Sequence, residues 1–394
     1  MKTLIKSFCC LLPLIFILFA CTQKEKTAGN EVVTVDVSRE YPVKKMLLQD
    51  IADVEYIRLE TTDDMLWQGY SVGAFTDRYI VNYNLGTGDI LFFDKTGKGI
   101  KKINRRGESG EEYSASTFFL PDEEYDEIYA NNRMKKKVFV YDMNGAFKRV
   151  FDYAPDSYYT DLAIFDSNRL IAYNKSYNED TANRFLILSK TTGEIEREFI
   201  LQQGGQKITE MHHIQDGENI FVYMLQTFPI LKFSSDFIIA DTSNDTIFSM
   251  NSSLERTPLI IQQPARATMD PPAFLYYAQE SRNYIFLISM LKKFVGAGPN
   301  MRSEEYKYLF YDKEKGMIYR QDIQNGDFSS GGEISIAPQT THFSASNKNV
   351  YLQILQAGDL IEAYEDNRLK GKLKEIAAGL DEEDNPVLLV ARLK

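Results

Sequence analysis

The sequence predicts an all-β fold, a six-bladed β-propeller whose N- and C-terminal strands close the ring and which carries a C-terminal helical insertion. Two observations predict it. Short aromatic or β-branched runs separated by polar turns dominate from Glu31 onward, as expected of half-buried strands. In addition, one hairpin unit recurs along the chain, and repetition at a period of this kind is typical of propeller blades.

The recurring unit is an aromatic strand, a polar turn and a second strand, and it covers residues 91–103, 138–151, 185–199, 246–260 and 308–321. The turns open at Asp94, Asp142, Ser189, Ser249 and Asp312. Asp and Ser side chains bond their own backbone at turns, and Gly, present in most copies, supplies a positive φ. A run of unrelated β-sandwiches is the alternative. Recurrence favours the propeller, because packed blades bury both faces of each hairpin.

The number of blades follows from length. At about 40–50 residues per blade the chain has room for seven or eight, but the longer spacings in its second half indicate insertions and favour six. The strand at 32–37 has no hairpin before it, and the strand at 386–394 has none after it. We therefore expect these two strands to pair in one shared blade.

Helical periodicity is scarce. Apolar residues at helical spacing predict one helix over 358–379, with Asp359 capping its start. Two prolines suit the first turn of a shorter helix over 271–280.

Residues 1–20 have the layout of a secretory signal peptide, with two lysines before a short apolar run. The segment LFAC at 18–21 resembles the bacterial lipobox, whose cysteine becomes the lipidated first residue after cleavage. An uncleaved anchor helix is the alternative, and the polar residues after Cys21 favour cleavage. We expect a signal peptide over 1–20, a lipidated tether over 21–31 and a single propeller domain over 32–394.

Composition limits the possible functions. The 394 residues carry Lys+Arg 45 and Asp+Glu 56, a formal net charge of -11, so too little positive charge is present for a nucleic-acid partner. The chain has Cys 3, and apart from Cys21 these are Cys9 and Cys10, inside the predicted signal peptide. The body therefore has no disulfide, thiolate metal site or thiol nucleophile.

Four segments, at 50–64, 92–113, 243–251 and 373–394, resemble the six-bladed β-propeller lipoproteins of Bacteroidota, which are related in style to NHL-type and TolB-like propellers. The second departs from the family pattern, because Ser-Gly-Glu at 109–111 stands where Gly-Pro-Gly is common. The resemblance implies a propeller fold and a periplasmic or cell-surface location, and it implies no single activity.

The same group links charged residues after the lipidated cysteine to surface export. Lys24, Glu25 and Lys26 match this pattern in part. We expect an outer-membrane lipoprotein, with its periplasmic or cell-surface side left open.

The richest polar loop is 104–113. There Arg105 and Arg106 present planar donors for a carboxylate or sulfate, and Glu111 and Tyr113 complete a candidate ligand-binding set. Pairing between Arg and Glu within an inter-blade loop is the structural alternative.

No pattern predicts a metal site, a cofactor or a catalytic set. His212 and His213 are adjacent, so on a strand they face opposite ways, and His342 lies far along the chain. The acidic runs at 122–127 and 381–384 lack the spacing of a calcium loop and are expected to be solvated turns. We expect Trp67 to have a packing role, and most of the Tyr 24 and Phe 25 to fill the layers between blades.

Three functions stay open. The favoured one is a non-enzymatic propeller, attached to the membrane by its lipid, that binds a glycan, a peptide or an envelope protein. The second is a glycan hydrolase or lyase with its site at the central channel. The third is a partner of an envelope complex that docks through the helix at 358–379.

Overall fold

The structure is a computed structural model. It describes residues 32–69, 72–114, 117–178, 181–201, 211–216, 219–224, 227–233, 236–295, 302–303, 305–337 and 349–394. The predicted signal peptide and tether, including Cys21, lie outside the described residues. Residues 32–394 form one contact unit.

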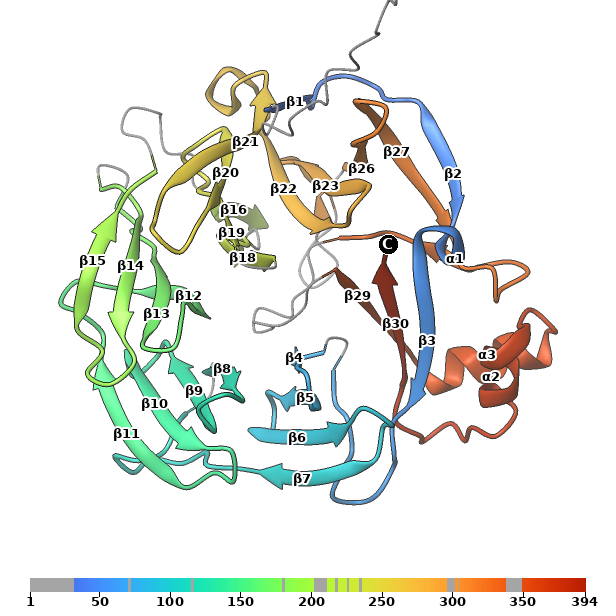
Figure 1. The fold of residues 1–394 in the computed structure, drawn as a ribbon, viewed down its shortest axis with the longest axis horizontal. Coiled ribbons are helices and arrows are strands. Elements are labelled where there is room, and N and C mark those ends of the chain that lie inside the picture. Colours follow the sequence, from blue (N-terminus) through green and yellow to red (C-terminus); the bar gives the residue numbers. More distant parts are fainter. Residues whose placement is uncertain are drawn as a thin grey trace, which may run out of the picture. The chain divides into compact units, whose positions relative to one another are not determined.

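Sheets arranged around a central axis form a six-bladed propeller, and the predicted all-β fold is confirmed (Figure 1). Each of the first three blades is built from four consecutive antiparallel strands, running from the axis to the rim (Figure 1). These strands are β4 (Ala74–Phe75), β5 (Tyr79–Asn84), β6 (Asp89–Asp94) and β7 (Gly99–Ile103) in blade 1; β8 (Thr117–Asp122), β9 (Glu127–Asn132), β10 (Lys137–Asp142) and β11 (Phe147–Asp152) in blade 2; and β12 (Tyr159–Ile164), β13 (Arg169–Asn174), β14 (Arg184–Ser189) and β15 (Ile195–Phe199) in blade 3.

The other three blades contain insertions or strands from distant parts of the chain. Blade 4 contains β18 (Ile230–Phe233), β19 (Asp236–Ile239), β20 (Thr246–Met250) and β21 (Arg256–Gln263); blade 5 contains β22 (Ala273–Glu280), β23 (Tyr284–Leu291), β26 (Tyr306–Asp312), β27 (Met317–Gln324) and the short β28 (Glu333–Ile334); blade 6 contains β29 (Val350–Leu355), β30 (Val387–Leu393) and β3 (Ala52–Arg58). Two small hairpins, β16 (Met211–Asp216) with β17 (Asn219–Met224) and β24 (Phe294–Val295) with β25 (Arg302–Ser303), are inserted before β18 and β26.

The five predicted hairpins are the third and fourth strands of blades 1 to 5. In the first, Asp94 Oδ1 accepts the backbone N–H groups of Thr96 (2.8 Å) and Lys98 (3.1 Å), and Gly97 has φ of 92°. The fourth corrects the prediction, because its turn opens at Asn251 rather than Ser249. Leu254 takes the positive φ there, 67°, that Gly takes in the other copies.

Blade 6 closes the ring, but not with the predicted strand. The C-terminal β30 lies between β29 and β3 and pairs with β3 from Leu393 opposite Ala52 to Val387 opposite Arg58. The prediction that 32–37 pairs with 386–394 is therefore wrong. β3 takes that place instead, because its apolar side chains pack in the blade core beside β30.

The N-terminal residues instead run along the rim (Figure 1). β1 (Val33–Asp36) pairs in parallel with β21 of blade 4, and β2 (Val43–Leu47) pairs in parallel with β27 of blade 5. The short helix α1 (Leu48–Ile51) then leads into β3. This rim segment, residues 33–58, thus adds an outer strand to three successive blades.

The rim segment covers the outer edges of blades 4 and 5. β1 pairs with β21 next to its apolar run Leu-Ile-Ile at 259–261, and β2 pairs with the mostly polar residues 320–324 of β27. The outer strands β7, β11 and β15 carry Lys, Arg or Glu together with exposed apolar residues such as Ile100 and Ile195. Charged side chains on an edge strand discourage pairing with another chain. None of the described strands pairs with the outer edges of blades 1 to 3.

Aromatic side chains fill the space between blades, as expected. The largest described core cluster joins blades 1, 2 and 3 and includes Phe92, Tyr129 and Phe139, all nearly inaccessible to solvent. Trp67 is buried against Phe93, with ring centroids 6.0 Å apart, which confirms its packing role.

Both helix predictions need correction. The segment 271–280 forms β22, because its aromatic residues pair with β23 as the inner strand of blade 5. The region 358–379 forms two helices, α2 (Ala357–Glu365) and α3 (Gly371–Ala377). The helix is interrupted because Asn367, between the two, has a positive φ of 54°, and Gly371, the first residue of α3, has a positive φ of 53°. Asp359 lies in the first turn of α2 and is not its cap.

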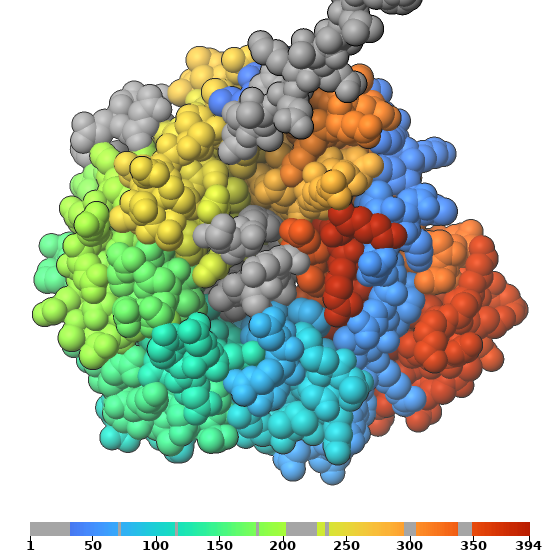
Figure 2. All heavy atoms as spheres, in the orientation of Figure 1, coloured from blue at the N-terminus to red at the C-terminus, as the bar shows by residue number. Residues whose placement is uncertain are grey.

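The helical insertion formed by α2 and α3 stands at the rim beside blade 6 (Figure 2). In the part of the chain that the structure describes, no helix is long and apolar enough to cross a membrane.

Buried asparagines hold the loops at one end of the blades. Asn84, Asn132 and Asn174 end the second strands of blades 1, 2 and 3. Asn84 Oδ1 accepts the N–H of Gln68 (2.8 Å) and Asn174 Oδ1 accepts that of Tyr158 (2.7 Å), while the amide of Asn132 bonds the loop before β8. Each asparagine therefore fixes the connection that arrives from the preceding blade.

Candidate functional site

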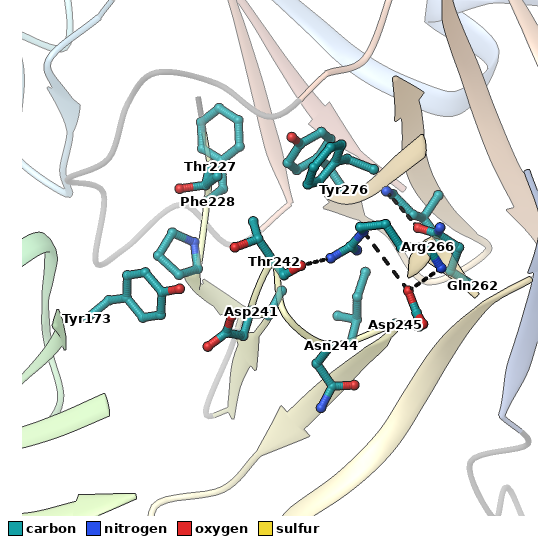
Figure 3. A pocket seen from close by; sticks show the side chains of 15 residues that line it. Tyr173, Thr227, Phe228, Asp241, Thr242, Asn244, Asp245, Gln262, Arg266 and Tyr276 are labelled. Carbon is teal, nitrogen blue, oxygen red and sulfur yellow. Dashed lines mark hydrogen bonds and ion pairs between the residues drawn. The ribbon is translucent and has the colours of Figure 1, made fainter. Parts of the chain in front are cut away.

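The candidate site is a pocket at the junction of blades 3, 4 and 5 (Figure 3). Its walls come from the end of β13, the residues before β18, the connection from β19 to β20, the end of β21 with the short helix η1 (Arg266–Thr268), and β22. The β19–β20 and β21–β22 connections leave the sheet at the same end of the strands, where the asparagine-held loops also lie.

Arg266 and Gln262 fix the wall between blades 4 and 5. Arg266 is buried, its Nη1 donates to the carbonyl oxygen of Thr242, and its Nε lies 3.3 Å from the carbonyl oxygen of Ala273. Gln262 donates through Nε2 to the same Ala273 oxygen (3.0 Å) and accepts the N–H of Leu275 through Oε1 (3.0 Å). Two nitrogens of the Arg266 guanidinium donate to backbone oxygens, and its Nε lies 4.0 Å from Asp245 Oδ1, so this side chain positions the wall.

The β19–β20 turn supplies the polar floor. Asp241 Oδ1 accepts the N–H (2.8 Å) and Oγ–H (2.7 Å) of Ser243 and also the Nδ2–H of Asn183 from blade 3 (3.0 Å). Asn244 accepts the N–H of Thr246 through Oδ1 (2.8 Å). Among the described residues, its Nδ2 is buried and has no hydrogen-bond partner, an arrangement that costs free energy unless a ligand or water accepts from it.

Aromatic rings surround the rest of the pocket. Tyr173, Phe228 and Tyr276 line the pocket together with Asp241 and Asn244, and Figure 3 shows the Asn244 amide at the opposite side of the pocket from the Phe228 and Tyr276 rings. The Phe228 and Tyr276 rings meet edge to face with centroids 6.3 Å apart. The enclosed volume is about 20 Å³, close to the size of one water molecule. The pocket therefore has room for one small polar group, such as a hydroxyl.

A buried carboxyl links the inner strands of blades 3 and 4 next to the pocket. Asp161 on β12 accepts the N–H of Leu162 (2.9 Å) and of Ile230 (3.3 Å), the residue after the pocket-lining Pro229. Burial raises the pKa of Asp161 to about 7, although these two amides and the charge of Arg133 act to lower it. With this pKa, the Asp161 carboxyl is expected to lose its proton near neutral pH.

The four predicted ligand-binding residues lie together in the loop that joins blade 1 to blade 2. Arg105 Nε donates to the carbonyl oxygen of Gly145 (2.6 Å), and Arg106 Nη1 donates to that of Gly86. Tyr113 is buried, and its hydroxyl donates to the carbonyl oxygen of Gly88 (2.7 Å) and accepts the N–H of Arg105 (2.9 Å).

The fourth, Glu111, is exposed, and its carbonyl oxygen accepts the hydroxyl of Tyr141 (2.7 Å). These contacts hold the loop to both blades. Ligand binding by the four residues stays a prediction.

The histidines and the second acidic run named from the sequence do not form a metal site among the described residues. His212 and His213 lie side by side on β16, and His342 is outside the described residues. Among the described residues, no group of three or more His, Cys, Asp or Glu side chains is arranged to hold a metal ion. In the second acidic run, Asp384 pairs with Arg58 (2.8 Å).

The first acidic run is a turn whose ends are paired with cations. Asp122 accepts from Lys190 Nζ (2.6 Å), and Glu127 forms a two-bond pair with Arg149 (2.6 and 2.8 Å). Burial alone would raise the pKa of Glu127, but hydrogen bonds from Arg149, Lys148 and Tyr129 lower it to about 2.

Sequence reasoning missed the pocket residues. The segment at 243–251 was noted for its resemblance to other propellers and, in part, as the start of the fourth hairpin, and it was not predicted as a site. The Asp-x-Ser pattern at 241–243 indicates a side-chain-capped turn. Its neighbours in the pocket come from strands up to about a hundred residues apart, and nothing in the local sequence brings them together.

Comparisons with known proteins agree with this fold. A family model described as "Domain of unknown function (DUF4934)" matches residues 32–392. A crystal structure of a protein from Bacteroides fragilis, named as exported, aligns with a TM-score of 0.61 at 16% identity over 92% of this chain and 100% of that chain. No curated protein matches the sequence.

Two further structures are more distant. A member of the DUF4221 family from Bacteroides vulgatus has a TM-score of 0.42 at 11% identity, over 88% of this chain and 99% of that one. Virginiamycin B lyase from Staphylococcus aureus has a TM-score of 0.34 at 12% identity, over 68% and 88% of the two chains.

The raised pKa of Asp161 predicts a specific pH dependence. The folded protein holds this proton up to pH about 7, whereas an unfolded Asp releases it near pH 3.9. The free energy of unfolding of the wild type should therefore fall between about pH 4 and pH 7 relative to that of Asp161→Asn. Urea unfolding across this range measures it, with the exposed Glu196→Gln as the control. Parallel profiles for wild type and Asp161→Asn would contradict the assignment.

Proposed function

The chain belongs to the DUF4934 family, and we propose that it is an exported, lipid-anchored propeller that binds a glycan at the pocket between blades 3, 4 and 5. The observation that carries this proposal is the buried, unpartnered Nδ2 of Asn244 in a pocket ringed by Tyr173, Phe228 and Tyr276. An amide donor among aromatic faces suits a sugar, whose hydroxyl accepts the hydrogen bond while its apolar face lies against a ring.

The size of the pocket supports binding of one group from a larger ligand. A space of about 20 Å³ takes a hydroxyl, and the sugar ring itself would lie over the mouth. Asp241 and Arg266 are held by neighbouring groups of the protein, so they keep the walls in place without reorganising when the ligand arrives. A peptide or an envelope protein that presents a hydroxyl or carbonyl group is the other partner class.

The second candidate is a glycan hydrolase or lyase, and Asp161 is the observation that favours it. A carboxyl with a pKa near 7 is suited to general acid–base chemistry. Its two backbone hydrogen bonds and its full burial favour a structural role instead. Shortened or unsaturated glycan products that Asp161→Asn no longer forms would favour the enzyme.

The pocket proposal predicts which substitutions weaken binding. Protein lacking residues 1–20 should bind members of a glycan array. Titration calorimetry with the best of them should give at least about fivefold weaker binding for Asn244→Ala and for Tyr276→Ala, since each removes a contact worth about 1 kcal/mol or more. Tyr306→Ala, at a partly exposed ring outside the pocket, should leave the affinity unchanged. Unchanged binding in both pocket variants, or no bound glycan, would contradict the proposal.

The lipid anchor is tested separately. We propose that Cys21 carries the lipid and that the outer membrane holds the protein, on the basis of the lipobox-like segment at 18–21. Cells fed radioactive palmitate should label the wild type and Cys10→Ala, whose substitution lies in the cleaved segment, but not Cys21→Ala. Label on Cys21→Ala would overturn the assignment.

A further inference from the structure

A second cavity lies away from the pocket, between the helical insertion and blade 6. We call it the α2 groove; its volume is about 380 Å³. Its lining comes from the loop after β27, the end of β29, α2 and the residue Arg368 that follows α2. Cavities of about 300–1,000 Å³ are the usual size for ligand sites.

The loop wall of the α2 groove is fixed from behind. Tyr56 donates its hydroxyl hydrogen to Asp327 Oδ2 (2.8 Å), and Gln49 Nε2 donates to Asn325 Oδ1 (2.8 Å). The carbonyl oxygen of Arg368 accepts the N–H of Ser329 (2.8 Å), which joins the loop to the helical insertion. The groove is therefore formed before any ligand arrives.

The polar lining of the α2 groove is rich in acceptors. Gln353 Oε1 is buried and, in the described part of the chain, has no hydrogen-bond partner. Asp359 and Glu362 add two carboxylates from α2. The one guanidinium, that of Arg368, is already paired with Glu362 and with Asp366, each at 3.1 Å. Two carboxylates line the groove against this one cation, so the charge balance there is negative.

The apolar lining faces the same space. Phe328, Leu355 and Leu360 come from the loop, from β29 and from α2. A ligand that suits this lining presents hydrogen-bond donors, positive charge and an aliphatic surface. The lysine side chain has this combination, with three donors on the ammonium group and a four-carbon stem.

We propose that the α2 groove binds a lysine side chain in a peptide segment of a partner protein. The ammonium group meets Gln353 Oε1 and the Asp359 carboxylate, and the stem packs against Phe328 and Leu360. The formal net charge of -11 attracts a basic partner at long range. This site is independent of the glycan pocket and gives the helical insertion a recognition role.

Fluorescence anisotropy tests the proposal. The probe is a fluorescein-labelled peptide Gly-Leu-Lys-Ala-Leu-Gly, titrated with protein lacking residues 1–20. Saturable binding with Kd below about 1 mM is expected, weakening as salt rises from about 50 to 300 mM. The same peptide with Nζ-acetyl-lysine should bind at least about tenfold more weakly, since acetylation removes the charge.

Variants locate the contact. Asp359→Asn and Gln353→Leu should each weaken binding of the lysine peptide at least about fivefold, with unchanged thermal unfolding. Glu375→Gln, an exposed acid of α3 outside the groove, should bind like the wild type. Asn244→Ala should also bind like the wild type, which separates this result from that of the glycan pocket. Equal binding of the acetylated peptide, no effect of Asp359→Asn and Gln353→Leu, or no saturable binding would overturn the proposal.

Discussion

The backbone pairing between β3 and β30 is the interaction on which the rest of the ring depends. A propeller blade buries both faces only if it has a neighbour on each side, so an open ring would expose the faces of two blades at once. β30 is paired on both sides and nearly all of its side chains are buried. β3 precedes blade 1 and β30 follows blade 5 along the chain, so their pairing encloses the intervening blades in the ring.

The rim segment extends the same principle outward. β1 and β2 give blades 4 and 5 an extra parallel strand before the chain reaches β3. Among the described strands, none pairs with the outer edges of blades 1 to 3, and the outer strand of each of these blades carries charged side chains, which discourage pairing with another chain. One segment thus closes the ring and covers the outer edges of two further blades.

Sequence reasoning recovered what depends on local interactions. Turns such as that at Asp94 and Gly97 bond within a few residues, so five hairpins and the blade number were predictable. The strand at 32–37 was assigned to the wrong partner, because pairing over more than two hundred residues leaves no local signal. The segment 271–280 was taken for a helix from its prolines, although its aromatic run is what pairs with β23.

The contrast between local and long-range interactions also applies to the candidate binding sites. The loop at 104–113 attracted attention because its charged residues are contiguous, and its arginines bond backbone carbonyls. The pocket around Asn244 is lined by segments of three blades that meet only through the fold. Most of the α2 groove is lined by residues 353–368, within and beside the segment predicted as a docking helix, and the fold adds Phe328 and Gly331.

Native-state hydrogen exchange measured by mass spectrometry tests the closure of the ring most directly. Amides of β3, β29 and β30 should exchange only through global unfolding, with the same free energy as the central strands of blades 2 and 3, while β1 should open at lower free energy. If β30 exchanges well before those central strands, the ring does not depend on the pairing of β3 with β30.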